Sequence, residues 1–349
     1  MPRTMLHVAI AALLSLSALA LAPAKAAEMT ALEKQLYDAA KKEGKLTWYV
    51  AQYSTKQSED HAQQFSKRYP GVTVDVIRTT GQVAYARLTQ DLRARAAQCD
   101  VFTGTDIGHY VTLKKSKQLM KFVPENHAKL RPAYKDLDAD GYYFTTSANP
   151  TVMIYNTKLV KKEDAPKNWP DLTDPKWVNQ VAVAHPGFSG SMGSWTVMME
   201  KLYGWEFFEK LKKNNPLIGR SLLDPPTILN AGERAVGISS MTTATKLSLD
   251  GNPIAIVYPT DGVKLTLSAT GILANAPHPN AAKLFANYLL SAENSTTLVK
   301  WGGQPLNAEV SPPKGVLSID EMKVGPLTEE EVVAKVPDAI ERWRDTFGN

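Results

Sequence analysis

The sequence predicts an α/β fold with two lobes, each a sheet flanked by helices, joined by a two-stranded hinge. Three observations predict this fold. Strands and helices alternate from about residue 30 to residue 120, two long β-rich runs occupy 141–160 and 252–273, and a second alternating series lies between these runs. Such alternation is typical of parallel sheets with helices on both faces. Two long runs that bracket an inserted α/β unit indicate a chain that crosses between two lobes and leaves a cleft.

The N-terminal segment, residues 1–26, is predicted to be a signal peptide. It carries Arg3, an apolar stretch over about 8–21 and the sequence AKA at 24–26, which suits a cleavage site. The apolar stretch is shorter than the roughly 20 residues that a membrane-spanning helix needs. We therefore expect export out of the cytoplasm, with cleavage near Ala26.

Composition and charge exclude some partners. The formal charge of +5 falls to +3 once residues 1–26, with Arg3 and Lys25, are removed, and the lysines form no basic stripe. Nucleic-acid binding usually needs a concentrated basic face, so we expect no nucleic-acid partner. The one cysteine, Cys99, cannot form a disulfide framework and is expected to be buried. Buried apolar area must then stabilise the chain, and its length suggests two domains.

The first lobe is predicted from strand–helix repeats with clear helix starts. Thr30 and Glu33 form a capping box, and Gly44 ends the helix that this box begins. Ser54 and Gln57 begin the next helix in the same way. The expected strands are 45–53, 72–79 and 99–104, and the expected helices are 30–43, 54–69, 82–98 and 109–119.

The second lobe repeats this alternation between the two crossings. Strands are expected at 180–186 and 235–240, with helices at 189–204 and 205–215. The C-terminal run from 328 reads as one or two capped amphipathic helices. The expected division is 1–26 signal peptide, 27–148 plus 262–310 lobe 1, 149–261 lobe 2 and 311–349 a C-terminal helical segment.

The stretch HPGFSGSMGSW, residues 185–195, is the strongest candidate for ligand contact. It precedes an expected helix, whose free N–H groups carry positive partial charge. Gly190 and Gly193 allow close approach to the main chain, while Ser189 and Ser191 add donors. A phosphate, phosphonate or carboxylate suits such a cradle. The alternative is that Ser189 only caps the helix.

Polar loops after the other strands are expected to meet the same ligand, because ligands of parallel sheets lie at the carboxyl ends of the strands. Asp106 and Asp261 could hold an amine or sugar hydroxyls, and each is equally suited to capping a helix or forming a turn. The expected ligand-binding residues are Tyr53, Ser54, Thr80, Gln82, Thr105 and Asp106 from the first lobe, Ser189, Gly190, Ser191, Ser240, Thr242 and Thr243 from the second, Asp261 at the second crossing, and Gln304 after a late helix.

Several motifs, taken in order, resemble a known family. They are VMIYNTKLV (152–160), DAPKNWPDLTDPKW (164–177), AGERAVGI (231–238), IVYPTDGV (256–263), PHPNAAKLFANYLLSAE (277–293) and GGQPLN (302–307). Together they are similar to periplasmic solute-binding proteins of ATP-binding-cassette importers, in the branch that contains the ferric-iron binders. The resemblance implies the two-lobed periplasmic binding protein fold, closure on a small solute, and delivery to an inner-membrane permease with its ATPase subunits. It implies no catalysis.

The solute is expected to be a small organic phosphate, phosphonate or carboxylate. In the family that this sequence resembles, the members that bind ferric iron carry adjacent tyrosines just after the segment that matches AGERAVGI. This sequence reads SSMTT there, at 239–243. Hydroxyls of Ser and Thr are poor ligands for Fe(III). The adjacent Tyr142 and Tyr143 lie on the first crossing, where hinge or core positions are expected. Ferric iron is therefore kept as the alternative solute.

An enzyme is not expected. SGSMG resembles the G-x-S-x-G nucleophile elbow, but Ser189 occupies the first glycine position. The sequence holds no H-E-x-x-H zinc motif and no G-x-x-x-x-G-K-[ST] phosphate loop. We predict a monomer without cofactor or metal, and a secreted serine hydrolase using Ser191 is the alternative from another class.

Overall fold

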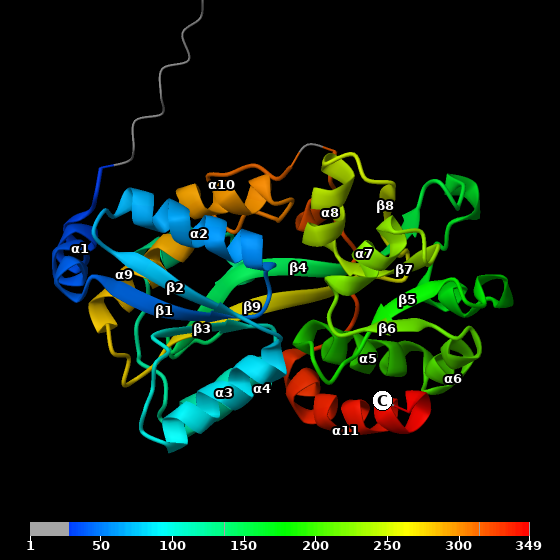
Figure 1. The fold of residues 1–349 in the computed structure, drawn as a ribbon, viewed down its shortest axis with the longest axis horizontal. Coiled ribbons are helices and arrows are strands. Elements are labelled where there is room, and N and C mark those ends of the chain that lie inside the picture. Colours follow the sequence, from blue (N-terminus) through cyan, green and yellow to red (C-terminus); the bar gives the residue numbers. More distant parts are fainter. Residues whose placement is uncertain (1–27, 136, 314, 349) are drawn as a thin grey trace, which may run out of the picture.

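The computed structural model describes residues 28–135, 137–313 and 315–348, so the expected signal peptide lies outside the described residues. Within them nine strands form one sheet, in the order β2-β1-β3-β9-β4-β7-β5-β6, with β8 paired to β4 (Figure 1). The strands are β1 (Lys45–Val50), β2 (Thr73–Arg78), β3 (Val101–Gly104), β4 (Tyr143–Asn156), β5 (Val181–Ala184), β6 (Leu217–Gly219), β7 (Val236–Ser240), β8 (Ile254–Val257) and β9 (Lys264–Ile272).

In lobe 1, β1 lies between β2 and β3 and pairs in parallel with both, as the alternation predicts. The core centres on Trp48, Phe65 and Phe285, whose rings meet edge to face at centroid distances of 5.0 and 5.1 Å. The helices of this lobe are α1 (Ala31–Glu43), α2 (Thr55–Arg68), α3 (Gly81–Arg93), α4 (Ile107–Lys115), α9 (Pro279–Leu289) and α10 (Ala292–Lys300).

Several expected elements end earlier than the sequence indicates, among them the helix expected at 109–119, which ends at Lys115, and the strand expected at 180–186, which ends at Ala184. The strand expected at 45–53 ends at Val50, which leaves Ala51 and Gln52 to the following loop. The helix expected at 82–98 ends at Arg93, because Arg95 adopts a left-handed conformation with φ of 54° that a helix cannot continue through.

The hinge consists of β4 and β9, which confirms the predicted two-stranded crossing. They pair antiparallel from Tyr143 opposite Gly271 to Thr151 opposite Lys264. The second β-rich run is split by a turn, so that β8 pairs with the far end of β4 and β9 returns to β3. The main chain therefore passes between the lobes along two adjacent strands at the centre of the sheet.

In lobe 2, β5 lies between β6 and β7 and pairs in parallel with both. Its core contains Trp169, Trp195 and Phe208, with ring centroids 5.4 and 5.9 Å apart. The helices here are α5 (Gly190–Tyr203), α6 (Glu206–Lys213), α7 (Asp224–Asn230) and α8 (Met241–Leu249). Short 3₁₀ helices elsewhere in the described chain are Glu125–Lys129, Pro132–Tyr134, Lys162–Asp164, Trp169–Thr173, Pro175–Trp177 and Ile319–Glu321.

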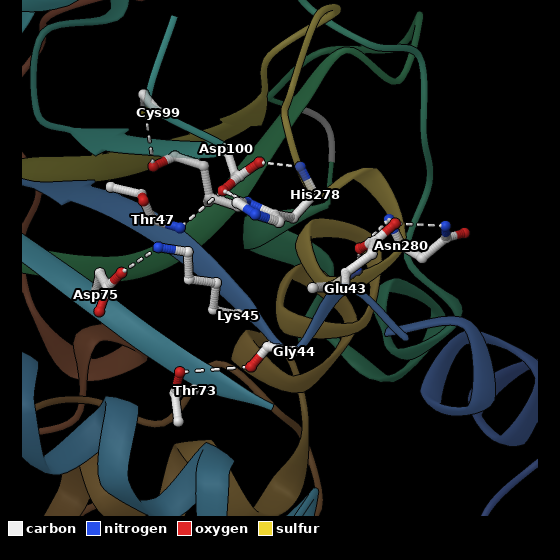
Figure 2. Close-up of polar contacts among 12 residues, drawn as sticks. Glu43, Gly44, Lys45, Thr47, Thr73, Asp75, Cys99, Asp100, His278 and Asn280 are labelled. Carbon is white, nitrogen blue, oxygen red and sulfur yellow. Dashed lines mark hydrogen bonds and ion pairs between the residues drawn. The ribbon is translucent and has the colours of Figure 1, made fainter. Parts of the chain in front are cut away.

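The segment after β9 packs against the N-terminal elements (Figure 2). The fully buried Asp100 accepts hydrogen bonds from the main-chain N–H groups of Thr47 and His278, and it contacts the His278 ring at 2.9 Å. Glu43, the last residue of α1, accepts from the main chain and side chain of Asn280 at the start of α9. These contacts join β1, β3, α1 and α9 in one lobe, although the sequence separates them by the whole of lobe 2.

The C-terminal region forms one helix, α11 (Glu329–Phe347), which begins with a capping box at Thr328. It packs against α5 and α6 of lobe 2 and against α4 of lobe 1 (Figure 1). Val336 and Ala339 share a core cluster with Tyr110 of α4 and Val197 of α5. The helix therefore bridges the two lobes. No helix in the described part of the chain combines the length and apolar character needed to cross a membrane.

Candidate ligand-binding site

A small cavity of about 40 Å³ lies between the lobes, where the carboxyl ends of their parallel strands face each other. A cavity needs about 10 to 15 Å³ to hold one water molecule, so this one accommodates a group of only a few non-hydrogen atoms. A larger groove of about 690 Å³ runs along α2 and β2, on the outer edge of the sheet and away from the strand ends. The cavity is lined by Ala51, Gln52, Thr80, Gly81, Thr105, Asn149, Phe188, Ser189, Ser191, Ser221, Leu222, Leu223 and Ser240.

The topology explains why distant segments meet here. In lobe 1, Gln52 follows β1, Thr80 follows β2 and Thr105 follows β3. In lobe 2, Ser189 lies in the loop after β5, and Ser240 is the last residue of β7. Because parallel strands end at one edge of a sheet, each lobe presents its polar loops to the other. The predicted convergence of these loops is therefore present in the structure.

Two of the helices that begin at the cavity have serine caps. Ser189 accepts from the N–H of Met192 at the start of α5, and Ser240 accepts from the N–H of Thr243 at the start of α8, each at 3.4 Å. Asn149 in the hinge donates to the Ser240 hydroxyl at 2.7 Å. Ser189 therefore caps α5, as the alternative to the anion cradle expected, and it also lines the cavity.

The third helix, α3, begins without such a cap. Thr80 occupies the N-cap position, but its hydroxyl makes no cap hydrogen bond. That hydroxyl is buried and has no partner among the described residues. Lobe 1 therefore presents a hydroxyl at the cavity that no described residue satisfies.

The two lobes are in direct contact beside the cavity. Gly190, the first residue of α5, lies against the main chain of Thr105 and Asp106 in lobe 1. A Cβ atom at Gly190 would lie 2.6 Å from the Asp106 amide nitrogen. The structure is therefore closed at this point, with no room for a side chain.

The cavity lining is electrically neutral. None of the residues that line it is charged. Asp106 lies close by, but its carboxylate accepts from Gly108 N–H at 3.0 Å and from the Gln82 amide at 3.1 Å. It also contacts the ring of His109 at 3.5 Å, and burial lowers the pKa of that ring. Hydroxyls, amides and the N-terminal ends of helices are therefore the groups available to a ligand.

The structure brings only part of the predicted set to the cavity. Thr80, Thr105, Ser189, Ser191 and Ser240 line it. Gly190, Gln82, Asp106, Thr242 and Thr243 lie in the layer behind, where they make lobe contacts, helix caps and hydrogen bonds to lining residues.

Four predicted residues have other roles. Ser54 caps α2 by accepting from the N–H of Gln57. The buried ring of Tyr53 stacks on His61 at 4.9 Å.

Asp261 and Gln304 are likewise occupied elsewhere. The carboxylate of Asp261 accepts from the Trp169 main-chain N–H and from the hydroxyl of Tyr203. Gln304 donates to the main-chain oxygen of Leu317 at 3.3 Å.

Sequence reasoning missed Asn149, Phe188 and the loop at 221–223. Asn149 had a signal, since it interrupts the first crossing just before Pro150, where a core strand would carry an apolar residue. Ser221 follows β6, a strand that the sequence analysis did not identify.

The described residues contain no group of three or more His, Cys, Asp or Glu side chains placed to hold a metal ion. Tyr142 and the buried Tyr143 lie away from the cavity, beside a groove of lobe 1 that Lys114 and Lys121 also line. The neutral donors of the cavity are therefore better suited to a negatively charged ligand than to a cation.

Comparison with known proteins places this geometry in context. A curated relative in Salmonella typhimurium, whose name proposes a 2-aminoethylphosphonate-binding periplasmic protein, is 27% identical over 320 residues, covering 86% of each chain. The solved structure of the periplasmic binding protein AfuA from Actinobacillus pleuropneumoniae, with exogenous fructose-6-phosphate bound, gives a TM-score of 0.79 at 23% identity and covers 88% of this chain and 99% of that one. Iron-bound HitA from Pseudomonas aeruginosa gives a TM-score of 0.72 at 21% identity, covering 86% of this chain and 99% of that one.

These structural likenesses establish the two-lobed fold of periplasmic binding proteins, which the sequence predicted. The profile of one protein family matches residues 48–296, most of the chain and both lobes. The chain belongs to the family of bacterial extracellular solute-binding proteins.

Proposed function

We propose that this protein captures a small organic anion, with a phosphonate, phosphate or carboxylate head group, in the cleft between its lobes. It then delivers the solute to the inner-membrane permease of an ATP-binding-cassette importer. The observation that carries the proposal is the convergence of three helix N-termini, those of α3, α5 and α8, on one closed cavity without acidic side chains.

Helix N-termini favour anions for two reasons. Their first N–H groups have no partner within the helix, and the helix dipole gives this end a positive partial charge. Ser191 and the hydroxyl of Thr80 add donors at the same place. An anionic head group of a few atoms fits the volume of the cavity and would be held by both lobes at once.

The relatives support this choice of solute. The names of two of them mention 2-aminoethylphosphonate and fructose 6-phosphate, which share a head group of phosphorus-bound oxygens. The proposal carries over that shared chemistry, a compact oxyanion on a small organic molecule.

Ferric iron is the weaker alternative for this cavity. Fe(III) is held best by anionic oxygen ligands, and none of the residues that line the cavity is Asp, Glu or Tyr. HitA binds iron within the same fold, so the fold does not decide between the two solutes. The neutral donor set of the cavity supports an anion.

Binding without turnover is the expected activity. The family consists of solute-binding proteins. Ser191 lines the cavity, yet no histidine does. The Nδ1 atom of the nearby His185 accepts a hydrogen bond from the N–H of Gly187 at 2.8 Å. A serine hydrolase needs a base aimed at the nucleophile, which this arrangement does not provide.

Thermal unfolding of the purified protein with a panel of solutes tests the proposal. The panel contains 2-aminoethylphosphonate, fructose 6-phosphate, inorganic phosphate, citrate, glucose and ferric citrate. A ligand at 100 times its Kd adds roughly 2.7 kcal/mol of stability, which raises the melting temperature by a few degrees. A rise with an organophosphorus or carboxylate anion supports the proposal. A rise with ferric citrate and not with citrate would replace it with iron binding.

A further inference from the structure

Lys264, the first residue of β9, is a buried lysine in the hinge. Its side chain is 5% exposed, and its ammonium donates a hydrogen bond to the main-chain oxygen of Leu265. It forms no ion pair with any residue that the structure describes. Burial lowers the pKa of this ammonium, and the carboxylate of Glu329 on α11 opposes that shift. A buried charge without an ion-pair partner costs stability, so its presence in the hinge calls for a function.

The strand register places Lys264 on the same face of the sheet as the cavity. Lys264 pairs with Thr151 of β4, and Thr151 pairs with Ser240 of β7, so the three side chains form one row across three strands. Asn149 and Thr266 form the next row. Ser240 and Asn149 both line the cavity. Two strand spacings, about 10 Å, separate the main chains of Lys264 and Ser240, and the lysine side chain spans much of that distance.

Unsatisfied hydroxyls surround this row. The side-chain oxygens of Thr151, Thr266 and Ser268 are buried and have no hydrogen-bond partner among the described residues. Buried polar atoms in proteins are nearly always paired, and each exception needs an explanation. Two of these hydroxyls, those of Thr151 and Thr266, adjoin the buried Lys264 ammonium, and together they form a set of donors that is the complement of an anion.

We propose that Lys264 supplies the positive charge that neutralises the anionic group of the solute, with Thr151 and Thr266 as the adjacent hydroxyl donors. The proposal rests on the proposed function and deepens it. On this proposal the solute carries a full negative charge. The protein then recognises that charge with the ammonium of Lys264 in the hinge as well as with the helix N-termini of the two lobes. Lys264 becomes a residue that determines specificity for charged over neutral solutes.

A purely structural role for Lys264 predicts a different outcome. If the ammonium only holds the Leu265 oxygen and attracts Glu329, replacing it lowers the stability of the ligand-free protein and leaves affinity unchanged. If it is a counter-charge kept for the solute, its removal leaves ligand-free stability equal or higher and weakens binding. A structural role therefore predicts lower stability with unchanged affinity. A counter-charge role predicts equal or higher stability with weaker binding.

The experiment compares Lys264→Met with Lys264→Arg, and uses Lys213→Met as a matched control at an exposed lysine of α6. Calorimetric titration with 2-aminoethylphosphonate and with fructose 6-phosphate gives affinities, and urea unfolding without ligand gives stabilities. We expect Lys264→Met to weaken binding by about tenfold or more, the loss of a hydrogen bond to a charged group. Lys264→Arg should retain more affinity than Lys264→Met, and Lys213→Met should match the wild type. Lys264→Gln replaces the methionine variant if that variant does not fold.

The outcomes separate this proposal from the proposed function. A wild-type protein that binds neither of these anions, nor any other anion of the thermal-unfolding panel, refutes the proposed function and this inference with it. A wild-type protein that binds, together with a Lys264→Met protein of equal affinity, refutes only the role of Lys264. An arginine variant as weak as the methionine variant also refutes it, because charge would then not be the property that matters.

Discussion

Gly190 of lobe 2 lies so close to Asp106 of lobe 1 that a Cβ on the glycine would be 2.6 Å from the Asp106 amide nitrogen. Gly190 begins α5, and Asp106 caps α4, so two helix starts from different lobes meet main chain to main chain. Real Cβ atoms do not approach backbone atoms this closely. The absence of a side chain at Gly190 is therefore a condition for closure of the cleft.

Gly190→Ala should preserve the fold and weaken solute binding. Alanine favours a helix by up to about 1 kcal/mol over glycine, so the ligand-free protein should be at least as stable. The methyl group holds the lobes apart, so the donors of one lobe no longer reach the solute. We expect the Kd for 2-aminoethylphosphonate to rise by about tenfold or more. In small-angle X-ray scattering, the radius of gyration should no longer fall when this solute is added.

Gly81→Ala is the matched control for this variant. Gly81 begins α3 at the same cavity, but a Cβ there would meet only the Ala51 Cβ, at 4.0 Å, an ordinary contact. This protein should still contract with ligand. If Gly190→Ala contracts as the wild type does and binds equally well, the lobes do not close through the Gly190 contact.

Ser240→Ala and Ser291→Ala should each lower stability, more so at Ser240, whose hydroxyl also accepts from Asn149, and they should differ in their effects on binding. Each serine caps a helix: Ser240 accepts from Thr243 N–H at 3.4 Å, and Ser291 accepts from Asn294 N–H at 3.1 Å. Loss of either cap should cost about 1 kcal/mol of the free energy of unfolding. Only Ser240 lines the cavity, so only its loss should weaken solute binding. Urea unfolding and calorimetric titration measure the two effects, and equal affinities for the two variants would remove Ser240 from the site.

The sequence alone was enough to predict the place of those cavity residues whose position depends only on the order of strands and helices. Thr80, Thr105, Ser189 and Ser240 follow strands of parallel sheets, and parallel strands end at one edge whatever their detailed register. Their convergence could therefore be predicted from the order of elements alone. The two long crossings could also be predicted, because a β-rich run as long as β4 exceeds what one lobe accommodates.

Residues whose position depends on strand register could not be predicted. Asn149 lies at the cavity, and Lys264 lies on the same face of the sheet, because of the pairing of β4 with β9, and that pairing shifts between Thr145 and Ser147. A shift of one residue moves every side chain to the opposite face, and a single sequence does not reveal it. Asp261 illustrates the opposite error, because its carboxylate turns to the Trp169 N–H and not into the cleft.

His61 should make the protein less stable as the pH falls from about 6.5 toward 4. Its buried ring contacts Asn294 Oδ1 at 2.6 Å, and burial lowers the pKa of the ring from 6.5 to about 4. Between these values the unfolded chain binds a proton at His61 and the folded chain does not. Folding therefore loses stability as the pH falls through this window, by an amount on the order of 3 kcal/mol over its whole width.

Urea unfolding at pH 7 and pH 4.5 measures this effect in the wild type and in His61→Gln, which keeps a polar group for Asn294. The variant should lose less stability between the two pH values. Burial also lowers the pKa of His109, but that histidine is present in both proteins, so its contribution cancels in the comparison. An equally steep loss in His61→Gln would assign the pH dependence to other groups.

Ser191→Asp should abolish anion binding without unfolding the protein. Ser191 lies in the first turn of α5 and lines the cavity, and a carboxylate in a first helical turn is favourable to the helix by roughly 0.3 to 1 kcal/mol. The same carboxylate would repel an anionic solute at close range, so we expect the affinity for 2-aminoethylphosphonate to fall by about a hundredfold or more. Ser191→Asn, of nearly equal size and without charge, isolates the electrostatic part, and equal affinities for the Asp and Asn variants would contradict the anion cradle. Because a carboxylate attracts a cation, a protein that instead binds ferric iron should bind it more tightly after Ser191→Asp, so the sign of the change identifies the charge of the solute.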